Sequence, residues 1–257
     1  RGGRAIDMVN AVVLAGAPND GKLAECDDAK YEALIEIHGK PMVSYVLDIL
    51  RSHSEIGKIV VVCPKEVSER LKAVPELIAV EERGGLLENL KAGLSQLDPD
   101  KLALIATADI PLLTHEAIDD LLKQAATHNA DIYYPVVKRE ACEARFPGIK
   151  RTYLAIRDGT LTGGNIVLAK PAALFDAGRF LEQAIATRKK PWMMAQVLGL
   201  RLIFKFLVGR LSIQDVELRL EALTGIRGMG VISDYAEIAF DVDKPKDLEL
   251  AKKILDG

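Results

Sequence analysis

The sequence has few cysteines and no long uninterrupted apolar run. Its three cysteines, Cys26, Cys63 and Cys142, are far apart and form no Cys-x-x-Cys pair. This argues against a zinc site and a disulfide framework, and it fits a reducing, cytoplasmic environment. The longest apolar stretch, 197–211, is interrupted by three basic residues and is too short to span a bilayer. The net charge of −3 gives no general attraction to nucleic acid or to an anionic membrane.

The remaining composition is that of a globular enzyme, with 49% hydrophobic and 28% charged residues in 257. This length suits one large α/β domain that carries an insertion. We predict a single domain over residues 8–257, with residues 1–7 as an extension before Met8. Within that domain we expect residues 171–230 to form a helical insertion or subdomain.

Short β-branched runs alternate with helical patterns in the first half of the chain. Buried strands are expected at 10–15, 58–63, 77–80, 101–107 and 131–137, with helices between them. Such alternation favours parallel strand pairing and a layered α/β/α sheet.

The second half has a different pattern. Asp158-Gly159 is a turn signal, so residues 151–170 are expected to form a hairpin at the sheet edge. Residues 171–224 are helical in pattern, and the run 197–207 is expected to be a buried helix or a contact with a membrane surface or a second copy. AEIAF (236–240) is expected to return to the sheet, before a helix over 245–255.

Acidic and glycine-rich segments follow three of the expected strands. LAGAPNDGKL (14–23) follows the first strand, Asp109 follows 101–107, and Asp241-Val242-Asp243 follows 236–240. Ligands of open parallel sheets bind beyond the carboxyl ends of the strands, so these segments are expected to meet. Mg²⁺ bound to nucleotide phosphates and held by one or two carboxylates suits such a site.

Each aspartate also has a purely structural interpretation. Asp109 could close a turn before Ile-Pro, and Asp243 could cap the helix that Pro245 begins. If the strand over 236–240 continues, Asp241 is expected to point away from Asp243, and it could be merely exposed.

Four segments together carry a family resemblance: LAGAPNDGKL, IHGKPMVSYVLDIL, ATADIPLLT and FDVDKPKDLELAKKIL. In this order they resemble the MobA-like nucleotidyltransferases, which include molybdenum-cofactor guanylyl- and cytidylyltransferases and related sugar-phosphate or isoprenoid-precursor cytidylyltransferases. The resemblance implies a Rossmann-like α/β/α sandwich with a mostly parallel sheet, of the nucleotide-diphospho-sugar transferase type.

The resemblance also implies a reaction. An NTP, with GTP or CTP favoured, binds with Mg²⁺; a phosphate or hydroxyl group of a small-molecule acceptor attacks the α-phosphorus, and pyrophosphate leaves. Catalysis then consists mainly of positioning and electrostatic stabilisation. Cofactor biosynthesis is the implied setting.

Position by position, the resemblance implies roles for ten residues. Nucleotide contacts come from Leu14, Ala15, Gly16, Ala17, Gly85 and Asn89, metal ligands from Asp109 and Asp243, and catalytic cations from Lys22 and Lys40.

The first segment departs from the family pattern, which runs Leu-Ala-Gly-Gly and continues to Arg-Met-Gly. Ala17 replaces the second glycine, and Gly21 stands where the arginine belongs, leaving Lys22 as the neighbouring cation. Glu32 stands where a lysine is usual, eight residues before the lysine of Gly-Lys-Pro. That lysine, Lys40, matches, although a surface lysine is its structural alternative.

The segment Thr162-Gly163-Gly164-Asn165 is a further candidate for ligand binding. Small residues let the backbone approach a ligand, so Gly163, Gly164 and Asn165 are predicted to contact the acceptor. The alternative is a β-turn at the end of a hairpin. The helical segment 171–230 is expected to shape the acceptor pocket or to form a contact in a homo-oligomer.

Two other functions stay open on the sequence alone. The altered first segment is compatible with a nucleotide-binding homologue that has lost transfer activity. The Asp-x-Asp form of 241–243 is compatible with a metal-dependent glycosyltransferase, although its place before the last helix argues against that.

Overall fold

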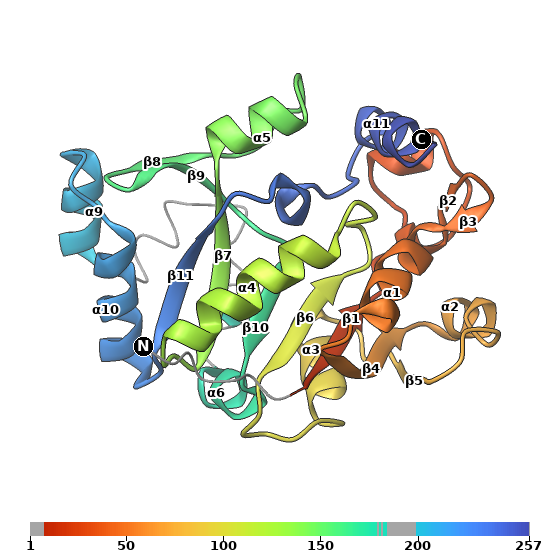
Figure 1. Cartoon of the computed structure of the whole chain (residues 1–257), viewed down its shortest axis with the longest axis horizontal. Coiled ribbons are helices and arrows are strands. Elements are labelled where there is room, and N and C mark those ends of the chain that lie inside the picture. The colour runs from red at the N-terminus through yellow and green to blue at the C-terminus, as the bar shows by residue number, and fades with distance from the viewer. Residues whose placement is uncertain (1–7, 179, 181, 184–198, 257) are drawn as a thin grey trace.

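The fold was examined in a computed structural model, which describes residues 8–178, 180, 182–183 and 199–256. A twisted central sheet runs through the molecule, with helices packed on both faces (Figure 1). Its strands in chain order are β1 (Val9–Leu14), β4 (Ile56–Cys63), β5 (Leu77–Glu81), β6 (Ala103–Thr107), β7 (Ile132–Lys138), β8 (Leu154–Ile156), β9 (Gly159–Gly163), β10 (Ile166–Ala169) and β11 (Gly228–Ser233). The described helices are α1 (Met42–Ser52), α2 (Lys65–Arg70), α3 (Leu86–Leu94), α4 (His115–Thr127), α5 (Arg139–Arg145), α6 (Pro171–Asp176), α9 (Leu200–Leu207), α10 (Ile213–Thr224) and α11 (Pro245–Leu255).

The sheet is mostly parallel, as predicted. Its order is β5-β4-β1-β6-β10-β7-β9-β8, and β11 also pairs with β7. Strands β5, β4, β1 and β6 are parallel, as are β7 and β11. The antiparallel strand β10 lies between β6 and β7. The hairpin β8–β9 forms at Asp158-Gly159, as expected, and β9 pairs with the last residues of β7. The expectation was wrong for residues 166–169, which form the inner strand β10 instead of part of an edge hairpin.

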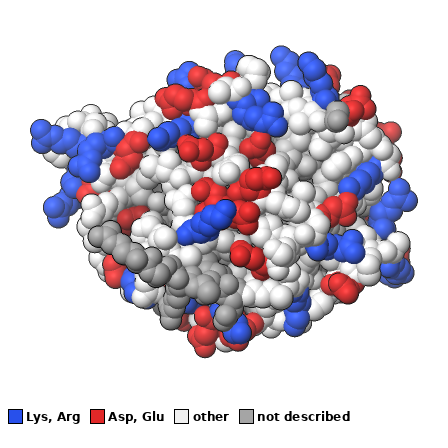
Figure 2. All heavy atoms as spheres, viewed as in Figure 1, with Lys and Arg blue, Asp and Glu red and all other residues white. Residues whose placement is uncertain are grey.

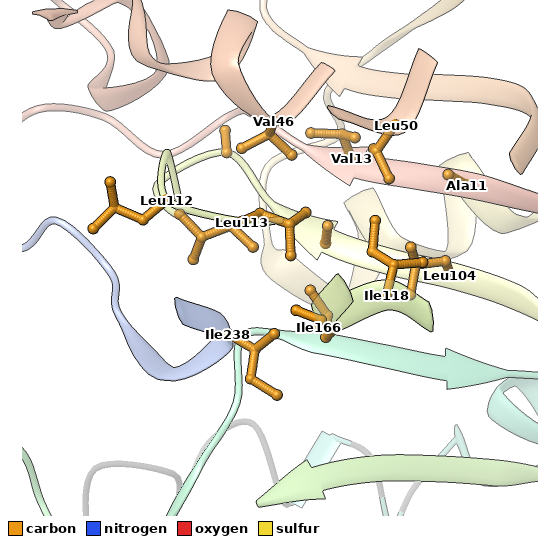
Figure 3. Close-up of a cluster of buried hydrophobic side chains, with 14 of the residues drawn as sticks. Ala11, Val13, Val46, Leu50, Leu104, Leu112, Leu113, Ile118, Ile166 and Ile238 are labelled. Atoms are coloured by element: carbon orange, nitrogen blue, oxygen red, sulfur yellow. The ribbon is translucent and has the colours of Figure 1, made fainter. Parts of the chain in front are cut away.

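Alternate side chains of the central strands serve two cores, which is why both faces are covered. On β1, Ala11 and Val13 pack with α1 and α4, whereas Val12 packs with α3 and α6. Figure 3 shows the first core, where side chains of β1, α1, β6, α4 and β10 meet. Period-two alternation within an apolar run explains this arrangement.

The prediction of a strand at 236–240 is wrong. Residues Ala236–Ala239 form a short 3-10 helix, η3, and the last strand of the sheet is β11. Because β11 begins Gly-Met-Gly, only Val231 and Ile232 in its second half carry the β-branched signal of a strand. The glycines permit close packing by α10: a Cβ on Gly228 would lie 2.5 Å from Leu220 Cδ2, and one on Gly230 would lie 2.5 Å from Ile213 Cγ2.

The described part of the segment 171–230 contains α6, α9 and α10, and its last three residues begin β11. On α9 only Leu202 is buried, so this helix is not the buried helix that its composition favoured. The rest of the predicted run, 197–198, lies outside the described residues, as does 184–196. Among the described helices, none is both long and apolar enough to cross a membrane.

Candidate active site

The loop that carries Asp109 is fixed on both sides by backbone hydrogen bonds. Directly after β6, the N–H of Ala108 donates to the carbonyl of Leu14 at 3.1 Å, which joins the ends of β6 and β1. Beyond Asp109, the side chains of Ile110, Leu112 and Leu113 are buried. The loop therefore places Asp109 at the carboxyl edge of the sheet, beside the glycine turn.

The segment 241–243 lies against this loop. The N–H of Val242 donates to the carbonyl of Asp109 at 2.9 Å, and the Val242 side chain is fully buried. Asp109, Asp241 and Asp243 each offer a carboxylate oxygen, and these atoms lie within 4.8 Å of one another. We call these three residues the acidic cluster.

The expectation that Asp241 points away from Asp243 is therefore wrong. Residues two apart in an extended segment face the same side, and Val242 between them faces the core. This periodicity was present in the sequence and identifies Asp241 as a third member of the site.

The acidic cluster is electrostatically unfavourable without a cation. Burial, and then the charge of Asp241, raises the pKa of Asp109 to about 6 and that of Asp243 to about 6. The Oδ1 atom of Asp109 is buried and has no hydrogen-bond partner among the described residues. Three oxygen donors with one unsatisfied buried oxygen fit a hard divalent cation such as Mg²⁺.

Asp243 does not have the capping role considered for it. The N-cap position of α11 belongs to Lys244, and no side chain caps this helix there. The backbone N–H of Asp243 instead donates to Asp247 Oδ2 at 3.2 Å. The carboxylate of Asp243 thus remains available to the acidic cluster.

An arginine that the sequence reasoning did not single out contacts the acidic cluster. Arg151, which precedes β8, forms a short ion pair with the carboxylate of Asp241, and its Nη2 lies 3.4 Å from the Asp241 carbonyl. Its side chain is only 14% exposed and lies over the ring of Phe240. Because Arg151 is 90 residues from Asp241, no local pattern predicts this contact.

The predicted nucleotide turn lies beside the start of α3. Leu14 ends β1, and Ala15 donates its N–H to Val62 at 2.9 Å. A Cβ on Gly16 would lie 2.7 Å from Glu82 Oε2 and 3.4 Å from Asn89 Nδ2. The structure therefore brings Gly16 and Asn89 together and adds Glu82, which follows β5.

Gly85 and Ala17 complete the predicted nucleotide contacts. Gly85 is the N-cap residue of α3, and Ala17 is exposed in the turn. The carbonyl of Ala17 accepts a hydrogen bond from the N–H of Glu32 at 3.1 Å. This bond fixes Glu32 beside the glycine turn.

Glu32 adds negative charge to the site. Burial, and then the carboxylates of Asp109, Asp243, Asp20 and Asp241, raise its pKa to about 7. The glutamate that replaces the family's lysine thus lies in the field of the acidic cluster.

Asn19 stabilises the loop between the glycine turn and Glu32. Its Nδ2 donates to the carbonyls of Asp27 and Ala29, each at 2.9 Å, and its N–H donates to Lys30 at 3.0 Å. Asn19 therefore closes a compact loop after the glycine turn.

The two predicted catalytic lysines lie apart from these contacts. Lys22 is exposed at the start of the 3-10 helix η1 (Lys22–Glu25). Lys40 lies on the two-residue strand β3 (Lys40–Pro41), where it pairs with Asp48 and lies 4.1 Å from the centre of the Tyr45 ring. This geometry is that of a surface lysine, and catalytic roles for both lysines stay predictions.

Gly163 ends β9, the second strand of the β8–β9 hairpin, and Gly164 and Asn165 connect it to β10. Gly164 donates its N–H to Pro135 at 2.9 Å, and Asn165 donates its N–H to Ile238 at 2.7 Å. The carbonyl of Asn165 accepts from Thr107, two residues before Asp109, at 3.3 Å. A backbone hydrogen bond at Thr107 therefore joins the predicted acceptor segment to the strand that leads to Asp109.

A mixed sheet of this order, with carboxylates and a glycine turn at its carboxyl edge, defines a nucleotide-diphospho-sugar transferase fold. Acidic side chains gather across the middle of the face shown in Figure 2. The model of the MobA-like NTP transferase domain matches residues 29–195. The chain belongs to this family of nucleotidyltransferases, as the resemblance implied. The match begins after the glycine turn, the segment that departs most from the family pattern.

Individual proteins are similar over different lengths. A hypothetical transferase from Thermus thermophilus is 36% identical, with a TM-score of 0.81 over 93% of this chain and 99% of that one. The bifunctional protein GlmU of Methylobacillus flagellatus is 32% identical over 46% of this chain, and a probable molybdenum cofactor guanylyltransferase of Thermococcus kodakarensis is 28% identical over 44%. The matched regions span 26% and 50% of these two relatives. The fold is also that of 4-diphosphocytidyl-2C-methyl-D-erythritol synthase from Anaerococcus prevotii, at 13% identity and a TM-score of 0.58.

Proposed function

We propose that this protein transfers an NMP group from an NTP, GTP or CTP in the first instance, to a phosphate or hydroxyl group of a small-molecule acceptor. The acceptor oxygen forms a bond to the α-phosphorus, the bond from that phosphorus to the β-phosphate oxygen breaks, and pyrophosphate leaves. The observation that carries the proposal is the buried, unpartnered oxygen of Asp109 beside two further carboxylates.

The residues of the site divide the work. Asp109 and Asp243 would hold Mg²⁺, which when bound neutralises the phosphate charge that develops as pyrophosphate leaves. Gly16 would present its backbone to the nucleotide, and glycine suits this position because a Cβ there would lie 2.7 Å from Glu82 Oε2. Gly163, Gly164 and Asn165 would contact the acceptor, and the packed loop of Ile110 to Leu113 would keep Asp109 in position.

A nucleotide panel tests the proposal. Melting temperatures are measured with GTP, CTP, ATP and UTP, each with and without Mg²⁺, and pyrophosphate release is then followed with candidate acceptors. A ligand at about 100 times its dissociation constant stabilises the folded protein by about 2.7 kcal/mol. A stabilisation that needs both one nucleotide and Mg²⁺, followed by release of pyrophosphate, is the expected result.

Matched variants connect the result to the site. Asp109→Asn should abolish the metal-dependent part of the rise in melting temperature. Asp98→Asn, in an exposed loop that precedes the start of β6, should leave that rise intact. Nucleotide binding without pyrophosphate release across many acceptors would instead favour a nucleotide-binding protein without transfer activity. This is the second candidate function, because Gly21 and Glu32 replace cations of the family pattern. Turnover of a nucleotide-sugar but not of any NTP would favour a glycosyltransferase.

A further inference from the structure

The site has an unusual balance of charge for a protein that binds a triphosphate. In the family pattern an arginine and a lysine stand where this chain has Gly21 and Glu32. Lys22 is exposed, and Lys40 is paired with Asp48. The described contacts of these segments therefore give the anionic nucleotide no buried cation.

Arg151 is a cation that does reach the acidic cluster. Its guanidinium pairs with the carboxylate of Asp241, and the two side chains are 14% and 20% exposed. The ring of Phe240 lies below it, 5.6 Å from the guanidinium carbon, and that ring packs in turn on Phe146 at 4.6 Å. A stacked, largely buried arginine has lost most of its conformational freedom before any ligand arrives.

The guanidinium has donors beyond those that Asp241 uses. An arginine carries five N–H donors in a planar fork, and this fork matches phosphate oxygens as well as it matches a carboxylate. The described bonds of Arg151 go to the Asp241 carboxylate and, weakly, to the Asp241 carbonyl. A divalent cation that draws the Asp241 carboxylate toward itself would leave still more of the fork free.

We propose that Arg151 binds the phosphate groups of the nucleotide and replaces the cations that the first segment lacks; this inference rests on the proposed function. In the ligand-free protein its charge is held by Asp241, and in the complex it donates to phosphate oxygens. The positive charge thus comes from the segment before β8 and not from the glycine turn.

A charge-neutral variant, Arg151→Gln, separates this role from structural support. Loss of the positive charge should leave Mn²⁺ binding to the nucleotide-free protein unchanged or severalfold tighter, because Asp241 becomes a free carboxylate. The same change should weaken binding of an α,β-nonhydrolysable nucleotide by about 10-fold or more, because a charge-assisted contact is lost. Arg151→Lys keeps the charge without the fork and should give an intermediate loss.

Arg145→Gln is the matched control. Arg145 is also an ion-paired arginine stacked on a phenylalanine: it bonds Glu237 at 2.7 Å and lies 5.4 Å from the Phe146 ring. Because it contacts Glu237 rather than the acidic cluster, both affinities should stay at the wild-type value. Melting temperatures of all four proteins report whether each variant is folded.

The outcomes separate the two proposals. Nucleotide binding by Arg151→Gln equal to wild type would overturn this inference and leave the proposed function in place. Parallel losses of Mn²⁺ and nucleotide affinity in Arg151→Gln and Arg151→Lys would assign Arg151 to structural support, which also overturns it. A wild-type protein that binds no nucleotide would overturn the proposed function, and this inference with it.

Discussion

The backbone N–H of Val242 donates a hydrogen bond to the carbonyl oxygen of Asp109 at 2.9 Å. This one bond joins two segments that are 133 positions apart. It places Asp241 and Asp243 on either side of the buried Val242, so that both carboxylates lie near that of Asp109. The acidic cluster is a consequence of this contact. Its carboxylates are held together by the backbone, although their charges repel one another.

Asp109→Asn should separate stability from activity. The change removes one buried charge from the acidic cluster. At pH 8 the unfolding free energy of the metal-free protein should therefore rise by about 1 to 2 kcal/mol, and its melting temperature should rise with it. Metal-dependent turnover should fall by about 100-fold or more. Melting curves and pyrophosphate release measure the two effects, and full metal-dependent turnover in the variant would refute the assigned metal site.

Glu32→Gln should change how stability depends on pH. The pKa of Glu32 rises from 4.5 to about 7 on folding, so the folded protein binds the proton more tightly. Wild-type stability should therefore fall as pH rises from about 4.5 through 7, because the ionised carboxylate opposes folding. At pH 8 the variant should be more stable than wild type, by about 1 to 2 kcal/mol, and at pH 4 the two should agree. Denaturant unfolding at both pH values measures the difference, and an equal difference at both would contradict the assignment.

Glu32→Lys restores the residue type that the family pattern places at this position. The added cation, next to the glycine turn, should increase affinity for the triphosphate and decrease affinity for Mn²⁺ in the absence of nucleotide, each by about 10-fold. Calorimetric titrations with nucleotide and with Mn²⁺ measure both values. Unchanged or weaker nucleotide binding in Glu32→Lys would show that charge at residue 32 is not what limits phosphate binding.

Gly16→Ala should weaken nucleotide binding with little effect on stability. The new Cβ would lie 2.7 Å from Glu82 Oε2, but the end of a half-buried glutamate side chain can move. A methyl group between the turn and a nucleotide should reduce nucleotide affinity by about 10-fold or more, by steric exclusion. Gly21→Ala, in the same loop with open space around it, is the control. Equal affinities of the two variants would argue that the backbone at Gly16 does not face the nucleotide.

Ser212→Ala tests the described end of the helical segment without touching the site. Ser212 caps α10: its Oγ accepts a hydrogen bond from the N–H of Asp215 at 3.3 Å, and the N–H of Ser212 donates to Asp215 Oδ2 at 3.1 Å. Loss of this capping box should cost about 1 kcal/mol and lower the melting temperature by about 2 to 4 °C. Ser54→Ala, at an exposed position, should change neither value, and an unchanged melting temperature for Ser212→Ala would mean that α10 contributes little to global stability.

The sequence predicted the layered sheet because short β-branched runs, such as that of β1 around Val12, alternate with helical patterns. It failed at β11, because Gly228 and Gly230 carry no strand signal of their own. Glycine is present at these two positions because α10 packs closely against them, and this is a tertiary contact. It also predicted a strand at 236–240, where the structure has a 3-10 helix with buried residues at Ala236–Ala239.

For the site, the segments and their order could be predicted from the sequence: a glycine turn after β1, Asp109 after β6, and an Asp-x-Asp before α11. Local spacing was enough for these, since strand ends and helix starts are read from neighbouring residues. Only the tertiary structure decided which charges meet. It brought Asp241 into contact with Arg151, set Glu32 beside the glycine turn through Ala17, and held Lys40 against Asp48. These contacts join residues distant in the chain, and their energies depend on burial and on the surrounding charges, which exist only once the chain has folded.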